Sequence, residues 1–260
     1  MAQWLSNYEV SFLRRKEIIL QMTKFNGLVL DIGCSIGAFS DELARQGAEP
    51  VGIDISSPAV KLANIHVGDF FFLCDGTELP FRNECFEAVT CADVLEHVKN
   101  DWKIIQEISR ILKSGGKAVF TVPMIRKGRI SDKDLKWADR WRHVRVGYTV
   151  WDMVTLLRRN GLKTIKMREF SCHFSFTKLL WHIGDKLVWK WKLQELLSID
   201  KDTDIEMLEL EAVRKLSGKL SIKLYICLFQ ILDGLLKLGD ALFPKSMKDH
   251  LAILAIKEEE

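Results

Sequence analysis

A short apolar run, a glycine-rich turn and a helix-like segment follow one another in residues 28–40, LVLDIGCSIGAFS, and constrain the fold most strongly. Residues 28–30 are typical of a strand buried on both faces of a parallel sheet. Gly33 and Gly37 bracket a tight turn, where a Cβ atom would hinder positive φ angles and the approach of backbone to a ligand. Ligands of such α/β units lie at the carboxyl ends of the strands. The stretch therefore predicts a nucleotide-type site, with a tight turn that binds nothing as the alternative.

The rest of the first 170 residues alternates between predicted strands and predicted helices. Further strands are expected at residues 50–55, 70–74, 86–91, 117–122 and 163–170. Helices are expected at residues 8–23, 39–46, 102–112 and 150–160, and in a short segment that Ser57 caps and Pro58 opens. The polar residues 126–147 show little periodicity. This alternation predicts a parallel sheet joined by right-handed crossovers.

Three acidic residues fall at the ends of three successive predicted strands: Asp31, Asp54 and Asp75. Because parallel strands end on one rim of a sheet, we expect these carboxylates around one crevice. A carboxylate at Asp54 can accept hydrogen bonds from both ribose hydroxyls, and one at Asp75 from an adenine amino group. A surface acid or helix cap at Asp54, and an ordinary turn aspartate at Asp75, are the alternatives.

The glycine turn differs from the turn that binds the pyrophosphate of a dinucleotide. That turn carries G-x-G-x-x-G, whereas here Asp31 precedes the turn and Ser35 occupies the position of the middle glycine. An acidic crevice suits a ligand with cationic character.

Five segments in order, LDIGCSIGAFS, GIDIS, CDGTELPF, FEAVTCADVLEHV and EISRILKSGGKAVFTVP, resemble the successive motifs of class I S-adenosylmethionine-dependent methyltransferases. They are most similar to the branch that contains the ubiquinone- and menaquinone-biosynthesis methyltransferases. The resemblance covers about residues 8–170 and a last predicted strand at 250–256. It implies a Rossmann-like α/β fold, with helices on both faces of a seven-stranded sheet whose last strand is antiparallel and lies between the fifth and sixth.

The resemblance also implies S-adenosylmethionine as the cofactor. By position, the glycine turn flanks the methionine part, Asp54 takes the ribose hydroxyls and Ile55 packs on adenine. Asp75 and Gly76 bind the adenine edge, and Ala92 closes the pocket. The expected cofactor-binding residues are Asp31, Gly33, Cys34, Ser35, Gly37, Asp54, Ile55, Asp75, Gly76 and Ala92.

Two histidines are candidate bases for the methyl acceptor, His97 in VLEHV and His143 in WRHVR. A structural role at the start of a helix is the alternative for His97, and a solvated loop histidine is the alternative for His143. No Asp-Pro-Pro-Tyr segment occurs, which disfavours exocyclic amines such as that of DNA adenine as acceptors. Residues 14–16, RRK, are expected to form a solvated basic face, with a salt bridge to a ligand carboxylate as the alternative.

Residues 171–248 are expected to form a helical insertion between the core at 1–170 and the last strand and tail at 249–260. Tryptophans beside lysines there favour either a helical cap or a lipid-binding lid, with peripheral membrane contact through 174–243. Asp200, Asp202, Asp204 and Glu211 match part of a calcium-loop pattern, but Ile205 replaces the glycine that such a loop needs, so no metal is expected.

Composition narrows the functional class. The net charge of +3 gives no reason to expect nucleic acid as a partner, and the six cysteines show no metal-ligand spacing. Reduced thiols and the absence of an apolar leader predict a cytoplasmic protein, with a peripheral position at the membrane as the alternative. Methyl transfer to a small-molecule or lipid-like acceptor is the expected function. A nicotinamide-dependent oxidoreductase and a non-catalytic, membrane-associated cofactor-binding protein are the alternatives.

Overall fold

The computed structural model describes residues 12, 14–126, 130, 132–140, 142–171 and 249–258. Residues 15–170 and 249–260 form one compact unit. The predicted helical insertion, the expected membrane contact and the calcium-like pattern lie outside the described residues. Within the described part, no helix is both long enough and apolar enough to cross a bilayer.

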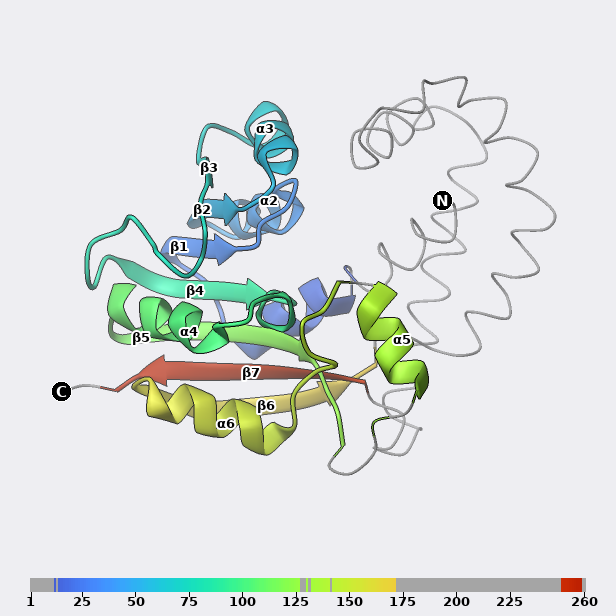
Figure 1. Cartoon of the computed structure of the whole chain (residues 1–260). Coiled ribbons are helices and arrows are strands. Elements are labelled where there is room, and N and C mark those ends of the chain that lie inside the picture. The colour runs from blue at the N-terminus through green and yellow to red at the C-terminus, as the bar shows by residue number, and fades with distance from the viewer. Residues whose placement is uncertain are drawn as a thin grey trace, which may run out of the picture. The chain divides into compact units, whose positions relative to one another are not determined.

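Seven strands form one sheet in the order β3-β2-β1-β4-β5-β7-β6 (Figure 1). The strands are β1 (Gly27–Ile32), β2 (Ala48–Asp54), β3 (Phe71–Leu73), β4 (Phe86–Ala92), β5 (Leu112–Pro123), β6 (Leu162–Phe170) and β7 (His250–Lys257). The strands from β3 to β5 pair in parallel, whereas β7 is antiparallel to both β5 and β6. The predicted seven-stranded sheet with an antiparallel last strand is therefore confirmed.

Helices connect the strands and cover the sheet. They are α2 (Ala38–Arg45), α3 (Ser57–His66), the 3-10 helix η1 (Leu95–His97), α4 (Asp101–Ile111), α5 (Asp132–Arg140) and α6 (Val150–Arg159). Residues 15–22 are also helical. The chain moves from β1 toward β3 and later from β4 toward β6, and right-handed crossovers in these two directions place helices on opposite faces. In Figure 1, α4 and α6 lie on the same face of the sheet.

Three details differ from the expectations. Residues 132–140 form α5, which was not predicted because its sequence, DKDLKWADR, is mostly polar. β5 begins at Leu112 rather than at residue 117, because residue 112 already pairs with Phe86 before the ladder shifts register. The N-cap of α3 is Ser56, whose Oγ accepts a hydrogen bond from the amide of Ala59 at 3.3 Å, and not Ser57.

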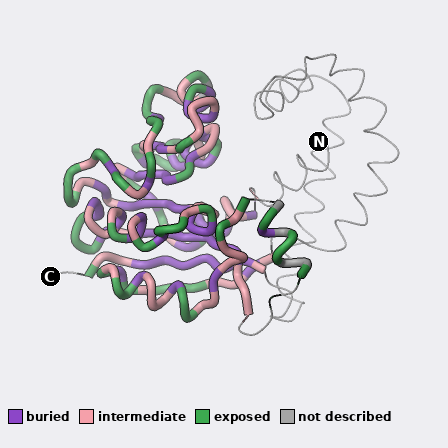
Figure 2. The backbone as a smooth tube through the Cα atoms, in the orientation of Figure 1, coloured by how far each residue is buried: buried purple, intermediate pink, exposed green. Residues whose placement is uncertain are grey.

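The core follows the middle of the sheet, where buried residues run along β1, β4, β5 and β7 (Figure 2). In β7 the first six residues are all buried, which explains the uninterrupted apolar sequence of that strand after its histidine. The strand order reverses beside β1, between β2 on one side and β4 on the other. Carboxyl ends of strands at such a reversal form the usual ligand crevice of an open α/β sheet.

Candidate active site

The three predicted carboxylates lie at the carboxyl ends of three adjacent strands. Asp31 is the penultimate residue of β1, Asp54 ends β2, and Asp75 follows β3 by two residues. Because β1, β2 and β3 are neighbours in the sheet, the structure brings the three residues to one rim, as the strand pattern predicted.

Asp31 is buried, with 3% of its surface exposed, and its hydrogen bonds connect β1 to α2 and to β4. Its carboxylate accepts a hydrogen bond from Ser40 Oγ on α2 at 2.7 Å and one from Thr90 Oγ1 on β4 at 2.8 Å. Burial raises the pKa of Asp31 to about 6, although the two hydroxyl donors favour the ionised form. The Asp31 side chain therefore fixes the start of the glycine turn and titrates near neutral pH.

The two predicted glycines occupy positions that only glycine fits. Gly33 has φ +73°, and a Cβ atom there would lie 2.4 Å from Val94 Cγ2. Gly37 has φ +79°, and its Cβ atom would lie 2.9 Å from Phe71 Cζ. Both positions therefore combine a left-handed backbone with a close neighbour, so the backbone of the turn can approach a ligand without side chains between them.

Asp54 joins the glycine turn to the turn after β2. Its Oδ2 accepts a hydrogen bond from the amide of Ser35 at 2.8 Å, and its Oδ1 accepts one from the amide of Ser56 at 2.9 Å. Ser35 has φ +49°, a left-handed conformation that glycine adopts more easily. Cys34 is buried beside these groups, and burial raises the pKa of its thiol.

The expected adenine side combines an exposed apolar residue with a turn carboxylate. Ile55 is 78% exposed, although it follows directly after a strand of the core sheet. Asp75 Oδ1 accepts hydrogen bonds from the amide and the hydroxyl of Thr77, at 2.8 and 2.9 Å. Gly76 is buried, and a Cβ atom there would lie 3.2 Å from Ile32 Cγ2.

A polar cluster follows Ala92, the last residue of β4. Asp93 has φ +53°, and its carboxylate accepts hydrogen bonds from Arg15 Nη1 at 2.6 Å and Thr121 Oγ1 at 2.7 Å. His250 Nε2 lies 3.6 Å from Asp93 Oδ2. Burial alone would raise the pKa of Asp93, but Arg15, His250 and Thr121 outweigh it and hold the pKa below its usual range.

The two candidate bases lie next to each other in the structure. The rings of His97 and His143 pack edge to face with centroids 4.6 Å apart, and Glu96 lies beside them. One ligand atom from each of the three residues lies within 4.8 Å of the others, so this group could hold a metal ion. The sequence pattern predicted no metal site, and that stays a prediction. Partial burial and the neighbouring His97 lower the pKa of His143 to about 4, so its imidazole is neutral at pH 7.

Glu96 is the buried member of this group, with 1% of its surface exposed. Its Oε2 accepts no hydrogen bond from any residue that the structure describes. Burial and the charge of Asp93 raise the pKa of Glu96 well above its usual value, so the environment favours the protonated carboxyl.

A second set of contacts holds the segment that carries His143. Arg145 forms an ion pair with Asp101 and donates a hydrogen bond to the carbonyl oxygen of Val98 at 2.8 Å. The hydroxyl of Tyr148 donates to Asp101 Oδ2 at 2.7 Å, and burial raises the pKa of Tyr148. These contacts join the segment to the start of α4, next to η1.

The basic residues before β1 do not form the solvated face that the sequence indicated. Arg15 binds the Asp93 carboxylate, and Lys16 Nζ lies 3.2 Å from Glu42 Oε2 on α2. Sequence reasoning missed Asp93 and Glu96 as well. Their position directly after a strand end that closes the expected pocket, in ADVLEH, was the available signal.

Comparison with known proteins agrees with this geometry. Residues 30–120 match the family described as "Methyltransferase domain". A ubiquinone biosynthesis O-methyltransferase of Nitrosomonas europaea is 36% identical over 104 residues, which are 36% of this chain and 42% of that protein. The chain spans less than half the length of the curated relatives that it matches.

Solved structures share the fold. A phosphoethanolamine N-methyltransferase 2 of Haemonchus contortus, in complex with S-adenosyl-L-methionine, has a TM-score of 0.63 and 20% identity, covering 95% of this chain and 53% of that one. The [4+2]-cyclase SpnF has a TM-score of 0.60 and 18% identity, covering 95% of this chain and 82% of that one. Because the fold also occurs in a cyclase, fold similarity alone does not identify a methyltransferase. That identification depends on the sequence match and on the motifs at the rim. Residues 30–120 therefore match a methyltransferase domain, and the chain shares the fold of these solved structures.

Proposed function

We propose that the rim of β1, β2 and β3 binds S-adenosylmethionine and that the protein transfers its methyl group to a small-molecule or lipid-like acceptor. The juxtaposition of Asp31, Asp54 and Asp75 around a glycine turn carries this proposal. An acidic rim suits a ligand that bears an ammonium and a sulfonium group better than it suits a pyrophosphate. A nicotinamide-dependent oxidoreductase is disfavoured for that reason.

The proposed roles of the rim residues follow from their contacts. Asp54 has a carboxylate already oriented by two backbone amides, from which it can accept the ribose hydroxyls. Ile55 is exposed where an adenine ring can cover it. Asp75 and Gly76 would face the adenine edge, and Gly33, Cys34 and Ser35 the methionine part.

For the acceptor we propose a hydroxyl group of a quinone-like small molecule. The names of the relatives, ubiquinone biosynthesis O-methyltransferases, support a hydroxyl acceptor. The cluster of Glu96 and His97, which follow β4 closely, and His143, whose ring packs against His97, supports a site where a proton can be taken up. Residues 171–248 are proposed as a helical insertion that shapes the acceptor site, and residues 172–248 of it lie outside the described residues.

The reaction would be an in-line displacement. The acceptor oxygen forms a bond to the methyl carbon, the carbon–sulfur bond breaks, and its electron pair neutralises the sulfonium, while the hydroxyl proton passes to the neutral imidazole of His143. In an alternative arrangement, ionised Glu96 with His97 and His143 would hold a divalent cation, which would lower the pKa of a hydroxyl bound to it. His143 would then be a ligand and not the base. The protein's main contribution is to position and dehydrate the reactants.

The test is to incubate the protein with methyl-labelled S-adenosylmethionine and cell extract, and to count label in organic-soluble, polar, nucleic-acid and protein fractions. We expect label in the organic-soluble fraction, and a turnover about 100-fold lower for H143Q, the usual effect of removing a general base. K163Q, which changes an exposed lysine 3.8 Å from Glu258, is the control. Label confined to nucleic acid or protein would refute the acceptor class. Cofactor binding without label in any fraction would favour the non-catalytic alternative.

A further inference from the structure

The loop of residues 74–85 carries Asp75 and Gly76 to the rim, but the sheet itself gives this loop little support. The preceding strand β3 has only three residues and lies at the edge of the sheet. Three ladder pairs with β2 cannot by themselves fix the conformation of a connection of this length. Other contacts must therefore hold the turn at Asp75 in place.

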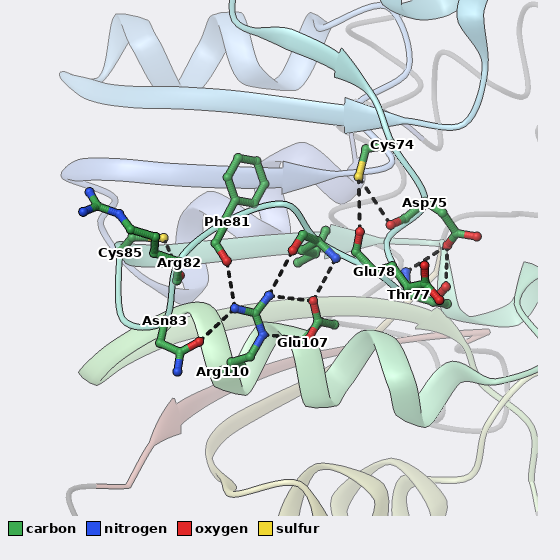
Figure 3. A network of polar contacts seen from close by, with 11 residues as sticks. Cys74, Asp75, Thr77, Glu78, Phe81, Arg82, Asn83, Cys85, Glu107 and Arg110 are labelled. Atoms are coloured by element: carbon green, nitrogen blue, oxygen red, sulfur yellow. Dashed lines mark hydrogen bonds and ion pairs between the residues drawn. The ribbon is translucent and has the colours of Figure 1, made fainter.

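The helix α4 supplies these contacts (Figure 3). The amide of Leu79 donates a hydrogen bond to Glu107 Oε2 at 2.8 Å. The Arg110 guanidinium donates to the carbonyl oxygens of Leu79 and Phe81, at 3.0 and 2.8 Å, and to Asn83 Oδ1 at 2.9 Å. Two side chains of one helix thus hold three positions of the loop.

The two α4 side chains also fix each other. Arg110 Nε and Nη2 donate to Glu107 Oε1 and Oε2, both at 2.7 Å, in a bidentate pair. The end of the loop joins the last turn of the same helix, because the amides of Glu84 and Cys85 donate to the carbonyl oxygens of Arg110 and Ile111, at 3.1 and 2.8 Å. The loop therefore follows α4 from Leu79 to its end.

The support at Leu79 reaches the rim through a short, internally bonded turn. The amide of Glu78 donates to the carbonyl oxygen of Asp75 at 3.1 Å, and Thr77 donates twice to the Asp75 carboxylate. Leu79 is itself buried. A displacement of Leu79 would therefore move the Asp75 carboxylate as well.

We propose that Arg110 and Glu107 are positioning residues for adenine recognition, and that they set the cofactor's affinity and base selectivity through the turn at Asp75. The inference rests on the proposed function, since it takes Asp75 and Gly76 as part of the adenosine site. A carboxylate held beside the adenine amino group accepts a hydrogen bond from it, and repels the carbonyl oxygen of a hypoxanthine at the same place.

The experiment measures the affinities of S-adenosylhomocysteine and S-inosylhomocysteine by calorimetry. The wild-type protein should prefer the adenosyl ligand. R110Q should bind it about tenfold more weakly, the change in affinity that corresponds to about one hydrogen bond. Its affinity for the inosyl ligand should change much less, so the selectivity ratio falls. R110K keeps the positive charge but lacks the planar guanidinium group that donates to several oxygens at once. Its affinities for the two ligands should therefore resemble those of R110Q.

Two further variants make the comparison decisive. E107Q keeps an oxygen that can accept from Leu79 and should show an intermediate selectivity ratio. R45Q removes an exposed ion pair with Asp41 on α2 and should leave both affinities unchanged.

R110Q with the wild-type selectivity ratio would overturn the inference, whether both affinities stay the same or fall together. If R110Q unfolds at the assay temperature, an unchanged ratio in E107Q overturns it and a lowered ratio supports it. Failure of the wild-type protein to bind either ligand would refute the proposed function, and the inference with it.

Discussion

Asp31 should make the stability of the protein depend on pH between about 4 and about 6, and D31N should remove that dependence. Its pKa is raised from 3.8 to about 6, chiefly by burial. In this pH range the native state keeps the proton that the unfolded chain has released. The native state is therefore favoured below pH 4, and the advantage is lost as the pH rises through about 6.

The magnitude follows from the two pKa values. At 1.36 kcal/mol for each pH unit, the gap between 3.8 and about 6 corresponds to about 3 kcal/mol of unfolding free energy. Asparagine is similar in shape, stays neutral, and retains one oxygen that can accept from Ser40 or Thr90. The stability of D31N relative to the wild type should therefore rise by about 2.4 kcal/mol between pH 4 and pH 7, the rest of the change lying below pH 4.

Urea unfolding of both proteins without ligand, at half-unit steps of pH, measures this difference directly. Subtracting the two curves removes the contributions of other groups that titrate in the same range. A difference that stays constant from pH 4 to pH 7 would refute the reasoning. S40A provides an independent check, because the Ser40 hydroxyl lowers the pKa of Asp31 and its removal should shift the fall in stability to higher pH.

Three further predictions concern the backbone and the buried ion pair. S35G should stabilise the protein by about 0.5–1 kcal/mol in urea unfolding, because Ser35 has φ +49°; a destabilised variant would contradict this. G33A should destabilise it by about 2 kcal/mol or more and weaken binding of S-adenosylhomocysteine, and V94A in the same chain should recover part of the stability, because the added Cβ meets that side chain. R15Q should cost about 2 kcal/mol by leaving the Asp93 carboxylate without its cation, and R15K should cost less; equal losses for both variants would show that charge is not the cause.

The rim of the proposed cofactor site could be predicted from the sequence because the residues that form it lie close together in the sequence motifs. Asp31, Asp54 and Asp75 each follow an apolar run that forms a strand, and the parallel arrangement of these strands brings their ends together. The glycine turn could be predicted equally well, and Gly33 and Gly37 do adopt positive φ angles. The sequence could not show that Ser35 accepts the same strained conformation.

The proposed acceptor side was only partly predictable because its contacts join distant segments. Arg15 and Asp93 are separated by 78 positions, and neither lies in a pattern that identifies the other as its partner. His97 and His143 were both candidates, but their edge-to-face contact depends on how the segment after α5 returns to η1. The helix α5 itself was missed because its sequence is mostly polar, with only Leu135, Trp137 and Ala138 as apolar residues.

The distant contacts also decide which of two neighbouring carboxyl groups holds a proton. Asp93 and Glu96 are close enough for the charge of one to raise the pKa of the other, so ionising both would be costly. Arg15 and His250 contact Asp93, which keeps that group ionised. Glu96, beside the two imidazoles, therefore takes up a proton in preference to Asp93. It follows that the protonation state of the proposed acceptor side is determined by a helix near the N-terminus and by the last strand, and not by the motif that contains it.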